Sequence, residues 1–350
     1  NSDGVQLVNG TANTTISGNW IGTDGVGVAR PNGLTGITIL GGAYSNTVGG
    51  GTLARMNIIA GNGSHGVLID GSTTSSNTIN LNDIGLNSAL LAAQAQTREG
   101  RRSAAPAQPS DIALPNGGHG ILIRNGAFGN RVLGENYIAN NVSSGIRLQS
   151  GAHDNVIGPG DRIYSNGLAG VSLADSATQW NRVMTETIYA NLRDGIEQGP
   201  GSTNNAWVAT RLYGNGGLGI DIDAPDGLGN TPSAGWPVIT SVVRSGGIVT
   251  LTGTSDATVG DLFPNTTRIY VFHSGLDPSG YGEGQTFVRE VTTDANGIWR
   301  ATYTEGGTPR CYSAYKRSFG FLLFNVYDYG SEFSPSICVP KVAYFPRVLR

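Results

Sequence analysis

Apolar and polar residues alternate in short runs that return at nearly constant intervals through the first two thirds of the chain. In each run a glycine precedes a β-branched apolar residue, any residue and usually a second apolar one. These glycines are Gly4, Gly36, Gly66, Gly120, Gly145, Gly170, Gly195 and Gly219, at intervals of 32, 30, 54, 25, 25, 25 and 24 residues. A period in this range predicts stacked repeats, because one unit cannot bury its apolar face alone.

Two further apolar runs in each period begin with an asparagine or aspartate. The first set begins at Asn13, Asn46, Asn77, Asn130, Asn155 and Asn181. The second set begins at Asn19, Asn57, Asn82, Asn136 and Asp161. Gly, Asn, Ser and Asp separate the runs and favour turns, so each period predicts three short strands.

Strands this short cannot pair as hairpins, because no two-residue turn separates them, but each can pair with its equivalent one period later. The pattern therefore predicts a parallel β-helix over residues 1–225, with about eight coils and three sheets. Coils spaced by about 4.8 Å would span on the order of 40 Å. We expect the repeated asparagines to form ladders in which each side chain bonds the backbone or the asparagine of the next coil.

One coil is longer than the others. The interval of 54 residues holds a single copy of each asparagine run, which predicts an insertion at about residues 90–115. Insertions in repeat proteins form loops, often on a binding face. A solvated loop without a binding role is the alternative.

The pattern changes after the repeats. Residues 226–237 are rich in Gly and Pro and predict a linker, and residues 238–350 hold longer alternating runs typical of an antiparallel, Ig-like β-sandwich with a C-terminal tail. The expected strands include Gly320–Tyr327, and Asp294–Gly297 is a hairpin signal. The apolar and basic end of the chain, from Val342, is either an edge strand or a sorting or docking tail.

Cys311 and Cys338 are the two cysteines of the chain, and both follow the repeats. No His/Cys cluster surrounds them, which favours a disulfide over a metal site. Two buried free thiols are the alternative.

Several motifs resemble those of a known family. Residues 19–25, Asn-Trp-Ile-Gly-Thr-Asp-Gly, resemble a phrase of secreted bacterial right-handed β-helix repeat proteins in the pectate-lyase-like superfamily. Residues 43–50 and 218–222 fit the same repeats, and residues 277–287 resemble a motif of the β-domain that often follows them. The resemblance implies a right-handed helix and secretion to an extracellular surface. It implies no single activity, because the family mixes lyases, hydrolases, epimerases and adhesins.

Four side chains on two adjacent coils are the candidates for catalysis. His65 and His119 precede equivalent glycines, and Asp70 and Arg124 follow at equivalent outward positions. An enzyme that acts on acidic sugars needs a base and a cation, which this set contains. The alternative interpretation is a solvated polar face.

The last coils carry a second candidate site. Glu197, Asp194, Asp221 and Asp223 are acidic residues on neighbouring coils, and their oxygens suit Ca²⁺. A charged rim at the end of the helix is the alternative. No other cofactor is predicted.

Composition narrows the class of partner. Only 13% of residues are charged and the net charge is −3, which excludes the basic face of a nucleic-acid binder. No apolar run reaches the roughly 18 residues of a membrane span. Five asparagines lie in N-glycosylation sequons, which the abundance of Asn, Ser and Thr also explains by chance: Asn9, Asn13, Asn62, Asn141 and Asn265.

Two classes of function are consistent with these patterns. The first is an extracellular structural or adhesive protein that associates with itself head to tail into filaments or a surface layer. Its expected assembly contacts are Val5 and Leu7 in the first coil, and Tyr344, Phe345 and Leu349 in the tail. The alternative is a polysaccharide lyase or hydrolase that acts on acidic glycans along the face of the helix.

Overall fold

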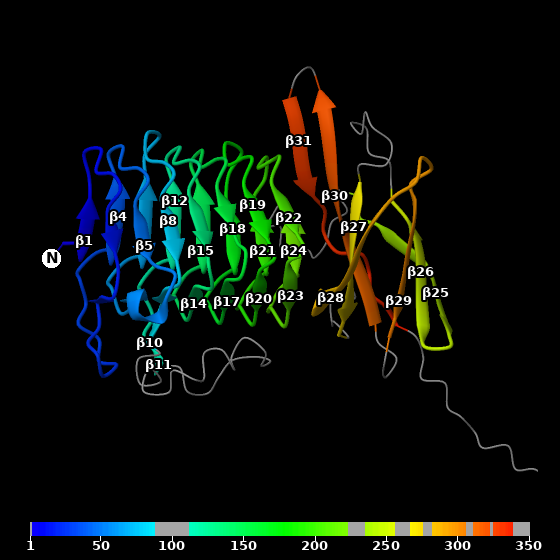
Figure 1. Ribbon diagram of the computed structural model, residues 1–350, viewed down its shortest axis with the longest axis horizontal. Coiled ribbons are helices and arrows are strands. Elements are labelled where there is room, and N and C mark those ends of the chain that lie inside the picture. The colour runs from blue at the N-terminus through cyan, green and yellow to red at the C-terminus, as the bar shows by residue number, and fades with distance from the viewer. Residues whose placement is uncertain are drawn as a thin grey trace, which may run out of the picture.

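The computed structural model describes residues 2–87, 112–222, 235–255, 267–275, 282–305, 311–322 and 325–338. Parallel strands stack into an elongated body, and antiparallel strands lie at its far end (Figure 1). The first parallel sheet contains eight strands, in the order β1 (Val5–Leu7), β4 (Ile37–Leu40), β7 (Val67–Asp70), β12 (Ile121–Arg124), β15 (Ile146–Gln149), β18 (Val171–Leu173), β21 (Ile196–Gln198) and β24 (Ile220–Ile222).

The other two parallel sheets have seven strands each. The second contains β2 (Thr15–Ile16), β5 (Thr47–Gly49), β8 (Thr78–Asn80), β13 (Arg131–Leu133), β16 (Val156–Ile157), β19 (Arg182–Met184) and β22 (Ala206–Val208). The third contains β3 (Trp20–Ile21), β6 (Ile58–Ile59), β9 (Asp83–Ile84), β14 (Tyr137–Ala139), β17 (Arg162–Tyr164), β20 (Thr187–Tyr189) and β23 (Arg211–Tyr213). A short 3-10 helix, η1 (Leu53–Arg55), precedes β6. The predicted parallel β-helix is therefore confirmed.

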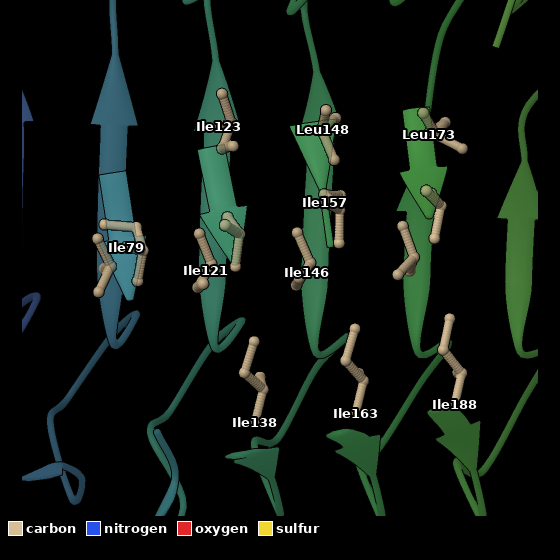
Figure 2. Close-up of a cluster of buried hydrophobic side chains, with 14 of the residues drawn as sticks. Ile79, Ile121, Ile123, Ile138, Ile146, Leu148, Ile157, Ile163, Leu173 and Ile188 are labelled. Carbon is tan, nitrogen blue, oxygen red and sulfur yellow. The ribbon is translucent and has the colours of Figure 1, made fainter. Parts of the chain in front are cut away.

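Each glycine run pairs with the next in the predicted register. Ile121 pairs with Val67 on one side and with Ile146 on the other, and Ile123 pairs with Leu148. These side chains are fully buried and stack along one continuous core, as Figure 2 shows. Burial of one such side chain contributes roughly 1.5–3 kcal/mol, so the repeated apolar positions are the main source of stability for the coils.

Asparagine ladders run along the turns of the helix. In the first ladder, the backbone N–H and Nδ2 of each asparagine donate to Oδ1 of the next, through Asn46, Asn77, Asn130, Asn155, Asn181 and Asn205. These side chains are buried. Because an unsatisfied buried amide costs about 1–3 kcal/mol, the ladder removes a penalty that every coil would otherwise carry, and the expectation of ladders is confirmed.

The second ladder lies just before the strands of the third sheet. Asparagines form its first part, and acidic residues take their place further along. It begins with Asn19, Asn57, Asn82 and Asn136. Asn136 then donates from its backbone N–H and Nδ2 to Oδ1 of Asp161, at 2.7 and 2.9 Å. Glu186 lies one coil further on, in the position before β20 that corresponds to Asp161 before β17. Two acids therefore replace asparagines here.

A third ladder was missed by the sequence analysis. It runs through Asn32, Asn62, Asn116, Asn141, Asn166, Asn191 and Asn215. Each of these asparagines stands four residues before a glycine of the main repeat. This constant offset was the signal that would have revealed the ladder.

The long coil carries a small antiparallel ribbon where it departs from the helix. β10 (Leu86–Asn87) pairs with β11 (Ile112–Ala113). The predicted insertion at 90–115 otherwise lies outside the described residues, as do most of the predicted linker and the end of the chain from 339 onwards.

The antiparallel strands form two sheets around a second core, and we call this part the sandwich. One sheet contains β25 (Val238–Ser245), β26 (Ile248–Thr254) and β29 (Ile298–Thr304). The other contains β28 (Thr286–Thr292), β27 (Arg268–Ser274), β30 (Cys311–Leu322) and β31 (Asn325–Gly330), with β32 (Ile337–Cys338) beside β30. Apolar residues from both sheets share one buried cluster, including Leu251, Trp299 and Val271.

Two local predictions in the sandwich were wrong. Residues 320–327 are not one strand, because β30 and β31 pair antiparallel from Leu322 opposite Asn325. The turn at 294–297 does not close a hairpin either, since β28 pairs with β27 while β29 pairs with β26. In both cases the alternation of apolar and polar residues correctly predicted strands. Which strands pair with each other depends on how the two sheets pack, which the alternation does not show.

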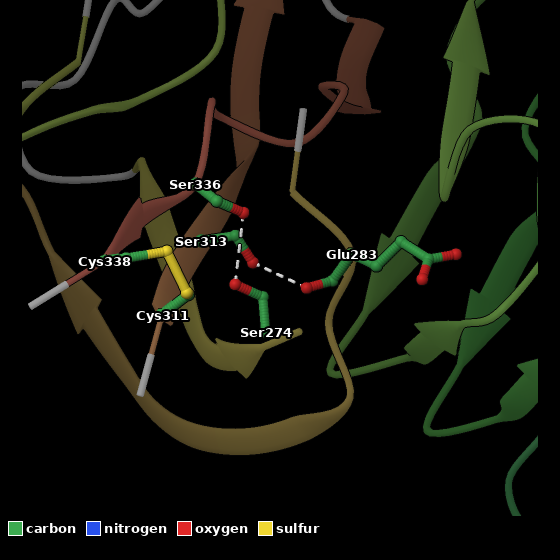
Figure 3. Close-up of a disulfide and its surroundings, with 6 residues drawn as sticks. All are labelled: Ser274, Glu283, Cys311, Ser313, Ser336 and Cys338. Atoms are coloured by element: carbon green, nitrogen blue, oxygen red, sulfur yellow. Dashed lines mark hydrogen bonds between the residues drawn. A yellow bond between two sulfur atoms is a disulfide. The ribbon is translucent and has the colours of Figure 1, made fainter. Parts of the chain in front are cut away.

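The predicted disulfide between Cys311 and Cys338 is present and joins β30 to β32. Close to it, the Ser313 hydroxyl donates to the backbone oxygen of Glu283 at 2.8 Å. Figure 3 shows that the Glu283 side chain extends away from the disulfide, toward the last coil of the helix. The part of the sandwich next to the disulfide thus positions Glu283, whose side chain reaches the helix.

The sandwich closes the C-terminal end of the helix. Leu212 and Trp207 in the last coil donate to the backbone oxygens of Gly284 and Ser331, at 2.9 and 2.8 Å. Thr210 donates its N–H to the Tyr315 hydroxyl at 3.0 Å. Aromatic side chains of the sandwich join the buried core of the helix at this end, namely Tyr270, Phe272, Tyr315 and Phe333. The apolar interior is therefore covered here.

Candidate functional site

The two histidines of the predicted catalytic set lie on adjacent coils with stacked rings, whose centroids are 5.3 Å apart. Nδ1 of His65 accepts the backbone N–H of His119 at 3.0 Å, and Nδ1 of His119 accepts that of Ser144 at 3.1 Å. Asp3 and Asp194 accept backbone N–H groups of the following coil in the same way. The histidines therefore have a structural role, because each accepts a backbone N–H of the next coil.

Their electrostatic environment limits their chemistry. Burial lowers the pKa of His65, and burial together with the neighbouring charges of His65 and Arg147 lowers the pKa of His119 to about 3. A side chain with that pKa is neutral near pH 7 and is a weak base for taking a proton from substrate. The proposed catalytic role of these histidines stays a prediction.

The other two members of the set form an ion pair at the far ends of the same strands, β7 and β12. Arg124 Nε lies 2.7 Å from Asp70 Oδ2, and Asn125 Nδ2 donates to Asp70 Oδ1 at 2.8 Å. Both oxygens of Asp70 are thereby engaged, while the two side chains remain partly exposed. The structure thus places the four predicted residues on neighbouring coils but in two separate pairs, about 16 Å of extended strand apart, and Asp70 is already committed to a partner.

The acidic residues of the last coils are recessed on the outer face of the first sheet. Glu197 and Asp221 are register partners in β21 and β24, and each is 8% exposed. Burial raises the pKa of Glu197, against the opposing charge of Arg193, whose Nη1 lies 3.9 Å away. Asp194 is occupied by the N–H of Leu218 at 2.7 Å.

These acids do not by themselves define a metal centre. Across the described part of the chain, no group of three or more His, Cys, Asp or Glu side chains is arranged to hold a metal ion. Asp223 lies outside the described residues. Calcium binding therefore stays a prediction.

Two of the predicted glycosylation residues belong to the third ladder. Asn62 and Asn141 are buried, and their Nδ2 atoms donate to Asn116 and Asn166. A glycan bonded to Nδ2 has no room there in the folded chain. Asn9 and Asn13 are exposed, and Asn265 lies outside the described residues.

No described residue covers the N-terminal end of the helix, in contrast to the closed C-terminal end, and we call it the open end. A depression of about 670 Å³ lies there, lined by residues of the first coil that include Val5, Ile16, Trp20 and Ile21. Leu7 lies in the adjoining core at 6% exposure. Large exposed apolar side chains gather in this region, namely Trp20, Val26, Val28, Leu34 and Tyr44. Trp20 and Val26 are 58% and 67% exposed, whereas the core residues Leu7, Ile16 and Ile21 of the first coil are only 6–8% exposed.

The direction of the ladder hydrogen bonds determines which polar groups the open end exposes. In all three ladders the N–H and Nδ2 groups donate toward the C-terminal end of the helix. The first coil therefore presents side-chain oxygens such as Oδ1 of Asn19 and Asn32 outward. A partner that extends the stack must bring N–H donors to these oxygens.

Neither a protein-family model nor a curated protein matches this chain. Within the described residues, no helix is long and apolar enough to cross a membrane.

Proposed function

We propose that this is a secreted structural or adhesive protein that assembles head to tail through its open first coil. The contrast between the two ends of the helix carries the proposal. One end is covered by the sandwich, whereas none of the described residues covers the strand edges of the first coil or the exposed Trp20 beside them. At about 25 cal/mol per Å² of apolar surface, covering an exposed side chain such as Trp20 contributes on the order of 1–3 kcal/mol.

The tail of a neighbouring copy is the proposed cover. Residues 341–350 include Tyr344, Phe345 and Leu349 for the apolar surface, and Arg347 and Arg350 as N–H donors. This composition matches an end that offers apolar side chains and acceptor oxygens. Because tail and first coil are different surfaces, the contact is heterologous and propagates into a filament or layer.

Secretion is proposed on two grounds. The disulfide is typical of proteins that fold in an oxidising compartment. The repeat motifs resemble those of secreted β-helix proteins in the pectate-lyase-like superfamily, and we propose a distant relation to them.

Electron microscopy of the intact chain tests the assembly. We expect filaments or sheets that are lost on Val5→Asp and on Phe345→Asp, with the subunit still folded. Val238→Asp, at an exposed position of the sandwich, is the matched control and should leave assembly intact. Equal assembly of a chain lacking residues 341–350 would contradict the proposed contact.

The second candidate function is cleavage of acidic glycans on the outer face of the first sheet. Glu197 favours it, because this buried acid with a raised pKa faces the next coil beside Asp221. Neighbouring strands stand about 4.8 Å apart, near the roughly 5–5.5 Å between the two carboxyl groups of retaining glycosidases. Release of reducing ends from polygalacturonate, lost on Glu197→Gln, would support this function; no release from any uronic-acid polymer would exclude it.

A further inference from the structure

The sandwich holds a charged and aromatic cluster that none of the functions above uses. Glu305, directly after β29, lies at its centre with a side chain that is 6% exposed. Its Oε2 contacts Arg244 Nη2 at 2.7 Å and accepts the Tyr312 hydroxyl at 2.9 Å. Arg244 also donates to the Tyr312 hydroxyl at 2.6 Å and lies over its ring. One oxygen of the carboxylate is therefore held firmly in place.

The other carboxylate oxygen is differently placed. Oε1 of Glu305 lies 2.9 Å from Nε2 of His273, but it is buried without a hydrogen bond of good geometry. The same Nε2 is 3.1 Å from the Tyr303 hydroxyl. Buried carboxylate oxygens normally accept hydrogen bonds from donors, so Oε1 can accept a further hydrogen bond.

A cavity of about 330 Å³ lies beside this cluster, between β27 and β28 of one sheet and β29 of the other. Its lining includes His273, Phe287, Tyr303 and Glu305, together with the hydroxyl-bearing Thr286 and Thr304. Phe287 stands at the rim, 37% exposed. An aromatic wall with a few fixed polar groups is the usual form of a small-ligand site, and this volume lies within the range of such sites.

We propose that this cavity binds one ring of an uncharged sugar. Sugar hydroxyls can bond Thr286 and Thr304, and they supply the donor that Oε1 lacks once the bound ligand shifts the side chains that shield this oxygen from solvent. The C–H face of a pyranose suits the exposed ring of Phe287. Arg244 and Glu305 together carry no net charge, so the cluster favours neither a cation nor an anion over an uncharged sugar. The assignment is independent of head-to-tail assembly, because it concerns different residues and a different readout.

Titration calorimetry of the intact protein with glucose, galactose and mannose tests the site. We expect at least one of them to bind in the millimolar range, and Phe287→Ala to weaken that binding roughly fivefold. Glu305→Gln should weaken it as well, and Phe287→Ala carries the test if that variant does not fold. Ile298→Ala, an exposed apolar residue of β29 that does not line the cavity, is the matched control and should bind as the parent does.

Three results would overturn the proposal. The first is the absence of any neutral sugar binding tighter than about 10 mM. The second is binding that Phe287→Ala and Ile298→Ala affect equally, which would place the ligand elsewhere. The third is tighter binding of glucosamine or glucuronate than of glucose, which would assign the cavity to a charged ligand.

Discussion

Oε1 of Glu283 accepts the backbone N–H of Asn215 at 3.1 Å, so a carboxylate from the sandwich holds the place of the next asparagine in the third ladder. Its Oε2 accepts the N–H of Gly214 at 2.6 Å. A second acid, Glu332, accepts the N–H of Ile222 at 3.0 Å where the first sheet ends. Because the ladders donate toward this end, acidic acceptors are the side chains that can terminate them.

Removal of this cap should loosen the last coil. We expect Glu283→Ala to lower the free energy of unfolding by about 1–3 kcal/mol, since it leaves two backbone donors without their charged acceptor. Glu283→Gln keeps one acceptor oxygen and should lose less. Urea unfolding measures both variants, and identical stability of Glu283→Ala and the parent would contradict the capping role.

A charge within the stacked core tests the coil register. Ile146→Asp places a carboxylate at a fully buried position and should unfold the helix or cost more than about 4 kcal/mol. Arg131→Asp, at an exposed position of β13, should change stability by less than about 0.5 kcal/mol. Thermal unfolding followed by circular dichroism compares them. Equal melting temperatures for the two variants would refute the register.

Reduction of the disulfide should destabilise the sandwich. The bond closes a separation of 27 residues, which on the chain-entropy model contributes about 3–4 kcal/mol. Cys311→Ser with Cys338→Ser should show the same loss as the reduced parent in denaturant unfolding. A double variant as stable as the oxidised protein would contradict this prediction.

The two acids in the second ladder should make stability depend on pH. Burial raises the pKa of Asp161 to about 7, helped by the charge of Glu135, and burial raises that of Glu186 well above its usual value. Oδ2 of Asp161 and both oxygens of Glu186 lack hydrogen bonds of good geometry, and the backbone amides near Glu186 only partly oppose the rise. Both acids are therefore protonated in the folded chain in mildly acidic solution.

The direction of the pH dependence follows from the number of protons that the folded and the unfolded chain bind. Between the unfolded value of about 4 and the folded value of about 7, the folded chain keeps the Asp161 proton and the unfolded chain does not, so stability falls as pH rises through this window. Asp161→Asn restores the ladder amide and should add on the order of 1–3 kcal/mol at pH 8. Denaturant unfolding from pH 4 to pH 8 measures the effect. An unchanged pH dependence in Asp161→Asn would rule out this origin.

The coils were predictable because their signals are local and repeated. Ile121 and Ile146 occupy the same inward-facing position in successive periods, and every glycine run repeats this position. The first two ladders followed from asparagines that directly precede strands. The third was visible only in the offset of residues such as Asn141 from the glycine four positions later.

The capping contacts and the cavity were not predictable in the same way. Glu283 and Phe333 reach the last coil from segments that carry no period, and their partners lie far away in sequence. The cluster around Glu305 joins Arg244, His273 and Tyr312 from three strands whose pairing depends on how the two sheets pack. Alternation alone cannot determine such contacts between sheets.

Sedimentation velocity of the intact chain over a range of concentrations tests head-to-tail assembly most directly. The open first coil predicts species larger than the monomer, which grow with concentration and are lost on Val5→Asp while the subunit stays folded. A single monomeric species at every concentration, with the first coil exposed to solvent in the native protein, would contradict the account.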